Sequence, residues 1–359
     1  MRRLDSMNET ISLNYRQKSI LNLFAQQAEL SREQIAAKLP SVFAVSKATL
    51  ARDLKHLIKN RLAVAAGSGP SRVYRAKNVH PLITYVDLEQ YFTLNPDERK
   101  SVLKSFTTDI FERLPGIITS QERQELTGIS RSFTAATKTL EPAILNRELE
   151  RYVIELSWKS SKIEGNTYTL LETETLIKQG QEASGRTKEE AIMILNHKDA
   201  FKTIVAHRRE FKKITLTDLL ELHNTLTKNL NIGSGMRKQA VGITGTTYQP
   251  PGNQWQIRQT LEQTLKTINA IDYPLEKASL TSTLIAYIQP FADGNKRTAR
   301  MIANAILLAN DYFPLSYRSL DENEYKQALI LFYETNNLYH VKRLFLEQYR
   351  FTLNTYFLA

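Results

Sequence analysis

Residues 288–300 read Ile-Gln-Pro-Phe-Ala-Asp-Gly-Asn-Lys-Arg-Thr-Ala-Arg. A turn-forming Asp-Gly-Asn stands directly before a helical pattern that carries two arginines three residues apart. Free backbone N–H groups at a helix N-terminus attract anions, arginine forks bind phosphoryl oxygens, and an aspartate can hold Mg²⁺. This stretch therefore predicts a loop, followed by a helix, that together hold a polyphosphate.

Four residues account for most of this predicted binding chemistry. Gly294 lets the backbone approach a ligand closely, and Asn295 stands where the helix begins, so the N–H groups from there on lack partners inside the helix. Arg297 and Arg300 share one helix face because they are three residues apart. A lone Asp-Gly-Asn is usually a simple helix cap, but Pro290 before it and the arginine pair after it favour a binding site.

The stretch lies within a long helical region. An apolar helical pattern over 280–288 precedes it, and another over 295–310 follows it. From about residue 140 onward almost the whole chain has such a pattern, which predicts an all-α body over 140–359. One exception is the segment 237–251, where small, polar and β-branched residues alternate and end in Pro-Pro. We expect this segment to form a β-hairpin flap beside the site.

The composition is that of an ordinary soluble globular protein, and 359 residues leave room for two or three domains. The absence of cysteine excludes disulfides and thiolate metal sites and favours a reducing compartment. The N-terminus lacks the apolar run of a signal peptide, and no stretch approaches the roughly 18 apolar residues of a membrane span. We therefore expect a cytoplasmic protein without a membrane partner.

Positive charge is concentrated near the N-terminus. Residues 1–77 have a net charge of +9, whereas the rest of the chain has only +2 of the total of +11. A basic segment beside a nearly neutral body is the electrostatic pattern of a nucleic-acid-binding module. The alternative is a solvated basic surface without a partner.

Three helical patterns and one hairpin pattern follow one another in this basic segment. The helices are expected over 16–27, 31–40 and 46–60, and two extended runs over 62–66 and 71–75 flank a Gly/Pro turn. Ser31 with Gln34 forms a capping-box signature, and Ser46 is a good N-cap. Three helices followed by a hairpin predict a winged helix-turn-helix domain over 1–77.

The third of these helices resembles the recognition helix of DeoR-type bacterial regulators over residues 45–54. In such folds this helix enters the major groove of double-stranded DNA, so we expect Lys47, Thr49 and Arg52 to reach the bases. Phosphate contacts are then expected from Lys55 and Lys59 on the same helix and from Arg72 in the wing. Winged helices also serve as protein–protein modules, but the charge of +9 favours DNA. A homodimer would match the paired half-sites that such regulators read, although no residue here specifies one.

Residues 78–139 are expected to be a helical segment that connects the two functional parts. The clearest pattern in it predicts a helix over 97–113, with Pro96 suited to its first turn. No chemistry is predicted for this segment.

The chain resembles the Fic (Fic/Doc) family over roughly residues 140–345. The resemblance rests on the motif at 289–300, on Ser-x-x-x-Glu-Gly at 160–165, on Gly-Met-Arg at 235–237 and on the pattern of the C-terminal helices. That family transfers AMP or related groups from nucleotides to protein hydroxyls. It implies an inhibitory helix, here placed at 147–165, and ATP or another nucleotide with Mg²⁺ as ligands.

The resemblance also implies roles for individual residues. Asp293 would coordinate Mg²⁺, and nucleotide phosphates would be held by Gly294, Asn295, Lys296, Arg297 and Arg300. Arg300 would hold the γ-phosphate, or pair with Glu164 when the inhibitory helix blocks it. Ser160 lies four residues before Glu164, which places both on one helix face.

Two positions of the motif depart from the family pattern. Gln289 stands where the family has the histidine that removes the proton from the target hydroxyl, and an amide cannot hold that proton. None of the six histidines replaces it. His223 lies where the family often has a structural histidine, and the other five lie outside the motif. Lys296 stands where most transferases have glycine and resembles the phosphorylating Doc-type relatives.

Three functions are consistent with these patterns. The first is a DNA-binding transcriptional regulator whose Fic-like domain binds a nucleotide but is catalytically impaired by the loss of the motif histidine. The second is an auto-inhibited protein adenylyltransferase, which modifies a hydroxyl of a protein target, in which Gln289 is an introduced or tolerated change. The third is a protein-interaction scaffold without nucleotide binding.

Overall fold

The computed structural model describes residues 13–27, 29–77, 80–100 and 102–357, and the chain divides into two compact units. Unit 1 contains residues 1–95 and 337–339, and unit 2 contains residues 96–336 and 340–359. The division falls inside the predicted connecting segment. The N-terminal residues from which the sequence excludes a signal peptide lie outside the described part of the chain.

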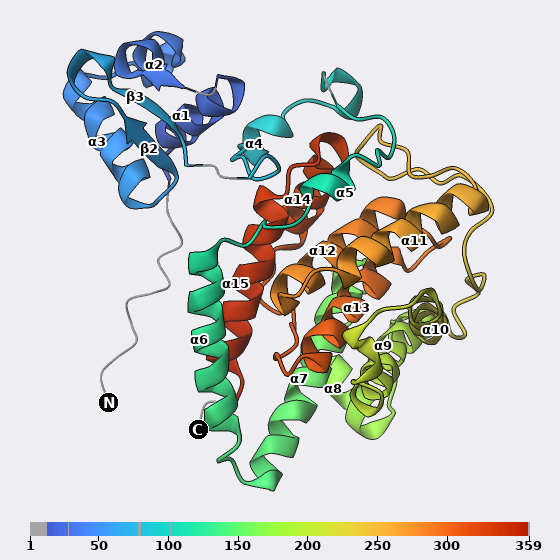
Figure 1. Ribbon diagram of the computed structural model, residues 1–359. Coiled ribbons are helices and arrows are strands. Elements are labelled where there is room, and N and C mark those ends of the chain that lie inside the picture. The colour runs from blue at the N-terminus through green and yellow to red at the C-terminus, as the bar shows by residue number, and fades with distance from the viewer. Residues whose placement is uncertain (1–12, 28, 78–79, 101, 358–359) are drawn as a thin grey trace. The chain divides into compact units, whose positions relative to one another are not determined.

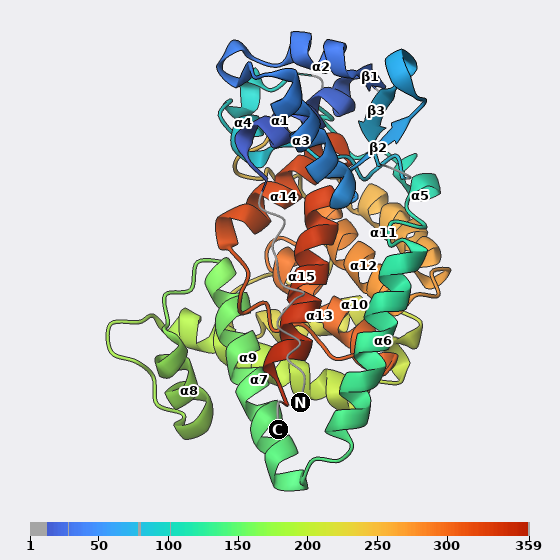
Figure 2. The same ribbon diagram turned by 90° about the vertical axis from the view of Figure 1, so that its left-hand side faces the viewer.

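Unit 1 combines helices with a small antiparallel sheet whose strand order is β1-β3-β2 (Figures 1 and 2). Its helices and strands are α1 (Tyr15–Gln26), β1 (Leu30–Ser31), α2 (Arg32–Lys38), α3 (Lys47–Lys59), β2 (Ala63–Ala66), β3 (Val73–Ala76) and α4 (Leu88–Tyr91). Two 3₁₀ turns, η1 (Ser41–Phe43) and η2 (Gly69–Ser71), connect them. The three predicted helices and the predicted hairpin of this unit are therefore present, each within two residues of its expected bounds.

Local capping explains why the helices of unit 1 begin where they do. The Ser31 hydroxyl accepts from the Gln34 N–H at 3.2 Å, and the Gln34 side chain accepts from the Ser31 N–H at 2.8 Å. The Ser46 hydroxyl caps α3 by accepting from the Thr49 N–H. These reciprocal bonds satisfy N–H groups that a helix N-terminus leaves unpaired.

A buried carboxylate joins α1 to α3 beneath the apolar core of unit 1. Asp53 is 5 % exposed and accepts from Arg16 Nε at 2.5 Å and from Gln17 Nε2 at 2.9 Å. The apolar core of the unit takes side chains from all three helices and from the sheet, among them Leu50 and Leu54. Because Asp53 neutralises Arg16, that arginine does not add to the free positive charge of the unit.

Unit 2 is helical. Its helices are α5 (Ile110–Arg113), α6 (Ser120–Thr137), α7 (Pro142–Ile163), α8 (Leu170–Gln179), α9 (Lys188–Ala206), α10 (Leu216–Thr227), α11 (Gln254–Asn269), α12 (Pro274–Ile288), α13 (Asn295–Ala309), α14 (Glu322–Thr335) and α15 (Tyr339–Thr355). The 3₁₀ turns η3 (Pro96–Glu98) and η4 (Glu210–Lys212) complete it. The fold class expected from the sequence, mainly α with a small sheet near the N-terminus, is confirmed.

The centre of unit 2 is the pair α12 and α13. Every residue of α12 from Leu275 to Ile288 is buried, and α13 is buried along almost its whole length. A helix that is covered on all sides lies in the interior of a domain. The helices α7, α9, α10 and α11 pack around this pair (Figure 1). The loop that joins α12 to α13 is therefore held at both ends by rigid, buried helices.

The predicted helix over 97–113 is wrong. Only the 3₁₀ turn η3 and the single turn α5 form there, and the described residues between them contain no helix. The Leu103 N–H donates to the Glu334 carbonyl at 2.7 Å, and the Lys104 carbonyl accepts from the Gln249 N–H at 2.9 Å. These long-range backbone bonds replace helical ones in this segment.

The predicted hairpin flap over 237–251 is also wrong in its secondary structure. The segment is irregular, with one isolated parallel bridge between Gln249 and Ser105. Its two ends are instead fixed by Arg237, whose Nη1 donates to the Gln239 carbonyl and whose Nη2 donates to the Pro251 carbonyl, both at 2.6 Å. One buried guanidinium thus closes the loop in place of a strand ladder.

Among the helices of the described residues, none is both long enough and apolar enough to cross a lipid bilayer.

Candidate functional site

The loop between α12 and α13 begins with a residue in the left-handed conformation. Gln289 has a φ of 49° and a ψ of 58° and ends α12, with its N–H donating to the Ile285 carbonyl at 3.1 Å. Its side-chain Nε2 donates to the Ala286 carbonyl at 2.6 Å. A non-glycine residue adopts this conformation rarely, and such positions are concentrated at functional sites. The Gln289 amide is thus engaged with the end of its own helix.

Asn295 and His223 fix the shape of this loop. The Asn295 side chain accepts from the Phe291 N–H and donates to the Phe291 carbonyl, both at 2.8 Å. His223 on α10 stacks on the Phe291 ring at 3.7 Å and lies 3.0 Å from the Asp293 carbonyl through Nε2, which must donate because the carbonyl can only accept. Burial lowers the pKa of His223. The loop is therefore pre-formed.

The N-terminus of α13 lacks a side-chain cap within the described residues. Gly294 precedes this helix with a φ of 77°. A Cβ at position 294 would lie 3.1 Å from Thr227 Cγ2 and 3.4 Å from Arg297 Nη2. Glycine is thus required both by its φ and by its neighbours. The N–H groups of the first turn and the helix dipole then attract negative charge.

Arg297 provides a buried positive charge beside this helix end. Its side chain is 2 % exposed, and Nη2 forms an ion pair with Asp293 Oδ2 at 3.2 Å. Nη1 is buried and has no hydrogen-bond partner among the described residues. Burial lowers the pKa of Arg297, opposed by the negative charges of Asp293 and Glu164. A buried donor without an acceptor is unfavourable, so this nitrogen indicates a place for an anion.

Arg300 is buried like Arg297, and its Nη1 forms an ion pair with a carboxylate. Its Nε donates to Ser160 Oγ at 3.0 Å, its Nη2 donates to the Ser160 carbonyl at 2.8 Å, and its Nη1 lies 2.8 Å from Glu164 Oε1. Burial raises the pKa of Glu164, but the positive charges of Arg300 and Lys296 outweigh it and hold that pKa below its ordinary value. Glu164 is therefore ionised and occupies the guanidinium face that a phosphate would use.

Residues 213–307, from the start of α10 through most of α13, match the family model described as Fic/DOC family. The chain contains a Fic/DOC domain. The match covers the motif loop and both arginines, but not Ser160, Glu164 or unit 1.

Curated relatives extend the match beyond the Fic/DOC domain. Protein adenylyltransferase Fic of Drosophila erecta is 27 % identical over 247 residues, which cover 67 % of this chain and 48 % of the relative. The protein of the same name from Aedes aegypti gives the same values. The chain thus spans about half the length of the curated relatives it matches.

Solved structures show the same fold at lower identity. Fic-1 of C. elegans has a TM-score of 0.55 at 19 % identity and is matched over 68 % of this chain and 73 % of that chain. A Fic domain containing signaling protein from Bacteroides thetaiotaomicron has a TM-score of 0.54 at 19 % identity, over 65 % of this chain and 94 % of that chain. The fold of the Fic/DOC domain is therefore shared.

Arg237 is a residue of the Fic/DOC domain to which the sequence assigned no role. Its side chain is 5 % exposed, and its Nε donates to the Gln289 carbonyl at 2.6 Å. Its own N–H donates to the Pro290 carbonyl at 2.9 Å. Arg237 thus ties the irregular segment before α11 to the first residues of the motif loop. All its acceptors are backbone carbonyls, which leave no signal in a sequence.

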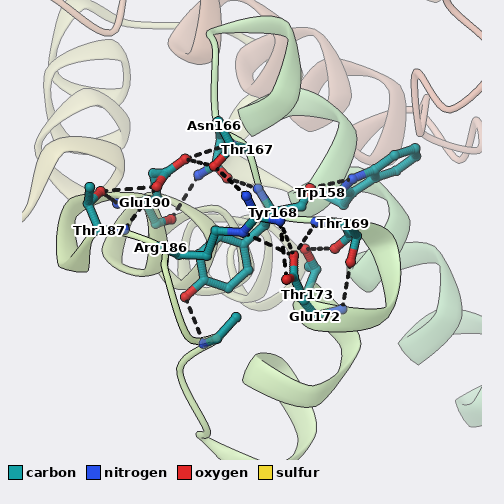
Figure 3. A network of polar contacts seen from close by, with 11 residues as sticks. Trp158, Asn166, Thr167, Tyr168, Thr169, Glu172, Thr173, Arg186, Thr187 and Glu190 are labelled. Carbon is teal, nitrogen blue, oxygen red and sulfur yellow. Dashed lines mark hydrogen bonds and ion pairs between the residues drawn. The ribbon is translucent and has the colours of Figure 1, made fainter.

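A polar network follows the Glu164 turn and surrounds residues 166–169 (Figure 3). Glu190, in the first turn of α9, accepts from the N–H and hydroxyl of Thr167, both at 2.6 Å, and from the N–H and hydroxyl of Thr187. Arg186 bridges Thr167 Oγ1 and the Glu172 carboxylate. Burial raises the pKa of Glu190, but these donors outweigh it and lower the pKa to about 2. The chain beyond Glu164 is therefore tied to α8 and α9.

The DNA-contacting residues predicted in unit 1 lie mostly in solvent. Five of them are exposed: Lys47, Arg52, Lys55, Lys59 and Arg72. Thr49 is half-buried, and its hydroxyl lies 3.1 Å from Ser46 Oγ and accepts from Arg52 Nη2 at 3.4 Å. The hydroxyl of Thr49 is thus shared between the cap of α3 and the Arg52 guanidinium.

Proposed function

We propose that the Fic/DOC domain of this chain is a protein adenylyltransferase domain held in an autoinhibited state. It would bind ATP at the N-terminus of α13 and transfer the AMP group to a hydroxyl of a protein target. The names of the curated relatives favour this function over the DNA-binding regulator with an impaired domain, which the sequence alone put first. The observation that carries the proposal is the difference between two buried nitrogens: Arg300 Nη1 forms an ion pair with Glu164, whereas Arg297 Nη1 has neither an ion pair nor a hydrogen bond among the described residues.

A nucleotide triphosphate fits this arrangement. Its phosphates would accept from the free N–H groups of the first turn of α13, with Gly294 leaving room for their approach. Arg297 Nη1 would gain the acceptor that it lacks. Arg300 would hold the terminal phosphate once Glu164 has left it.

The residues also fit Mg²⁺, which the relatives' reaction implies. The Asp293 side chain is 69 % exposed, beside the N-terminus of α13. Within the described residues, no three acidic or histidine side chains come together to hold a metal by themselves. Mg²⁺ in nucleotide sites is held by one or two carboxylates together with phosphate oxygens, so Asp293 alone suffices. When bound, the ion neutralises charge on the phosphates.

Transfer requires that a proton leave the target hydroxyl. The hydroxyl oxygen forms a bond to the α-phosphorus, and the bond from that phosphorus to the pyrophosphate oxygen breaks. The Gln289 amide cannot take the proton, and the loss of a general base lowers a rate by about 10²–10⁴-fold. The chain with Gln289 would therefore bind nucleotide and transfer it slowly.

Labelling with radioactive α-³²P-ATP tests this proposal. The parent chain, Glu164→Gly, Gln289→His and the double variant would be incubated with ATP and Mg²⁺, and protein-bound AMP would be measured. We expect the double variant to label about 10²–10⁴-fold faster than Glu164→Gly. Strong labelling by the parent chain would contradict the role of Gln289. Failure of Glu164→Gly to bind ATP in calorimetry would contradict the nucleotide site itself.

DNA binding by unit 1, as a winged helix-turn-helix domain, is a second candidate function. The observation that favours it is the row of exposed basic residues along α3 on a unit with a high positive charge. Basic side chains that neutralise phosphates release counterions, so binding should weaken steeply with salt. A fluorescence titration with duplex DNA at increasing salt tests this, and binding that does not change with salt would contradict it.

A further inference from the structure

His197 lies in the interior of unit 2, against Ser160 of α7, the helix that ends just before Glu164. It comes from α9 and is 0 % exposed. Its Nδ1 is 2.8 Å from the Met193 carbonyl, and its Nε2 is 2.9 Å from Ser160 Oγ. A carbonyl can only accept, so Nδ1 carries the proton and Nε2 is an acceptor. The Ser160 hydroxyl must then donate its proton to His197.

The direction of this bond determines what Ser160 offers to Arg300. With its proton committed to His197, the Ser160 oxygen has only lone pairs left, and it accepts from Arg300 Nε at 3.0 Å. The Ser160 carbonyl accepts from Nη2 at 2.8 Å. Two points therefore fix the guanidinium plane, and Nη1 is left for an anion, which is Glu164 in this structure.

The surroundings keep His197 in the neutral form that this bond requires. Burial and the nearby charges of Arg297 and Arg300 lower the pKa of His197 to about 3. A protonated imidazole would place a second donor against Ser160 and compete for its lone pairs.

The same helix, α9, also holds the segment beyond Glu164. The Asn166 side chain donates to the Glu190 carbonyl at 2.9 Å, and the Glu190 carboxylate binds Thr167 (Figure 3). Contacts from α9 thus reach the chain on both sides of Glu164, at Ser160 before it and at Asn166 and Thr167 after it.

We propose that His197 is a positioning residue for Arg300, which acts by orienting the Ser160 hydroxyl. The orientation serves Arg300 in both of its pairings, with Glu164 when the site is closed and with the terminal phosphate when a nucleotide is bound. This inference rests on the proposed nucleotide-binding function. It differs from a simple packing role, because it requires a hydrogen-bond acceptor at the position of Nε2.

Two substitutions of His197 separate these roles. In His197→Asn, the amide lies near the position of Nδ1 and loses the acceptor toward Ser160. In His197→Gln, the longer side chain returns an amide oxygen near the position of Nε2. Each would be made in the full chain with Glu164→Gly, so that Arg300 is free for a phosphate, and ATP and ADP affinities with Mg²⁺ would be measured by calorimetry.

We expect His197→Asn to weaken ATP binding about tenfold or more, as for a lost hydrogen bond to a charged group, and to affect ADP little. We expect His197→Gln to remain within about threefold of the Glu164→Gly parent. If His197 acts through Ser160, adding His197→Asn to Ser160→Ala should weaken ATP binding no further.

Equal losses for ATP and ADP, additive losses with Ser160→Ala, or equal behaviour of the Asn and Gln variants would each overturn the proposal. If Glu164→Gly binds neither nucleotide, the proposed function fails instead, and the two failures are thereby distinguished. Should His197→Asn not fold, a comparison of Ser160→Ala with Glu164→Gly still tests the ATP-specific loss, and unchanged ATP affinity there overturns the proposal.

Discussion

Two groups of cationic side chains in this protein, the arginines at the N-terminus of α13 and the lysines of α3, differ in their exposure to solvent. At the N-terminus of α13, Arg297 and Arg300 are 2 % and 1 % exposed, and fixed contacts orient them. On α3, Lys47, Lys55 and Lys59 extend into solvent. A buried guanidinium has lost its hydration and is stabilised only by an anion in one position, whereas exposed ammonium groups act through counterion release. The proposed functions accordingly assign a small phosphate ligand to the first group and a polyanion to the second.

The largest expected effect comes from removing the guanidinium of Arg297, whose Nη1 has no partner among the described residues. In the Glu164→Gly background, Arg297→Ala should weaken ATP·Mg²⁺ binding by about 10–100-fold, because each hydrogen bond to a charged group contributes roughly 1.5–3 kcal/mol. Calorimetry at low and high salt measures this. Arg258→Ala, on the exposed face of α11, is the matched control and should leave the affinity unchanged. An Arg297→Ala variant with parental affinity would contradict the distinction between the buried arginines and the exposed lysines.

The second effect tests whether the N-terminus of α13 requires the backbone conformation of Gly294, a requirement that the exposed lysines of α3 do not have. Gly294→Ala should destabilise the Fic/DOC domain by about 1–2 kcal/mol, because an alanine is strained at positive φ and its Cβ would crowd Thr227. Denaturant unfolding measures the loss. Gly233→Ala is the control, since that glycine has no positive φ and no atom near its Cβ position. Equal stability of both variants would contradict the required conformation.

The third effect concerns the exposed lysines of α3. Lys55→Ala and Lys59→Ala should each reduce the steepness of the salt dependence of DNA binding by about one unit, with a loss of affinity that is similar for all sequences. Titrations with two unrelated duplexes at several salt concentrations measure this. Lys326→Ala, an exposed lysine of α14, should change neither value. An unchanged salt slope in the α3 variants would place the DNA contacts elsewhere.

The same contrast explains which parts of the structure were accessible from the sequence. The helices of unit 1 were predicted closely because their signals are local, such as the caps at Ser31 and Ser46. The helix over 97–113 was predicted wrongly because the backbone of this segment bonds to Glu334 and Gln249, which come from distant parts of the chain. Local periodicity cannot reveal such partners.

At the candidate site, the motif residues were found because they are adjacent in sequence. The ion pair of Glu164 with Arg300 was expected from the family resemblance and is present at 2.8 Å. His197 was missed because its partner Ser160 is 37 positions away, and Arg237 was missed because it binds backbone carbonyls. Both residues would require a three-dimensional view, since neither belongs to a recognisable local pattern.

The smallest expected effect is a dependence of folding stability on pH, which comes from His197 beside the buried arginines. His197 has an ordinary pKa of 6.5 in the unfolded chain and a pKa of about 3 in the folded one. The unfolded state therefore binds more protons below pH 6.5, and folding stability falls as the pH is lowered toward 3. Between pH 7 and pH 6 the loss from this histidine is about 0.7 kcal/mol.

Tryptophan fluorescence during denaturant unfolding measures this loss in unit 2, because both tryptophans, Trp158 and Trp255, lie there. His197→Gln has no titrating group at this position, so its stability should change less between pH 7 and pH 6. The lowered pKa of Glu164 adds acid sensitivity only near and below its ordinary range, so it does not obscure this window. If the parent and His197→Gln lose stability in parallel from pH 7 to pH 6, His197 is not held neutral by its burial and the nearby arginines.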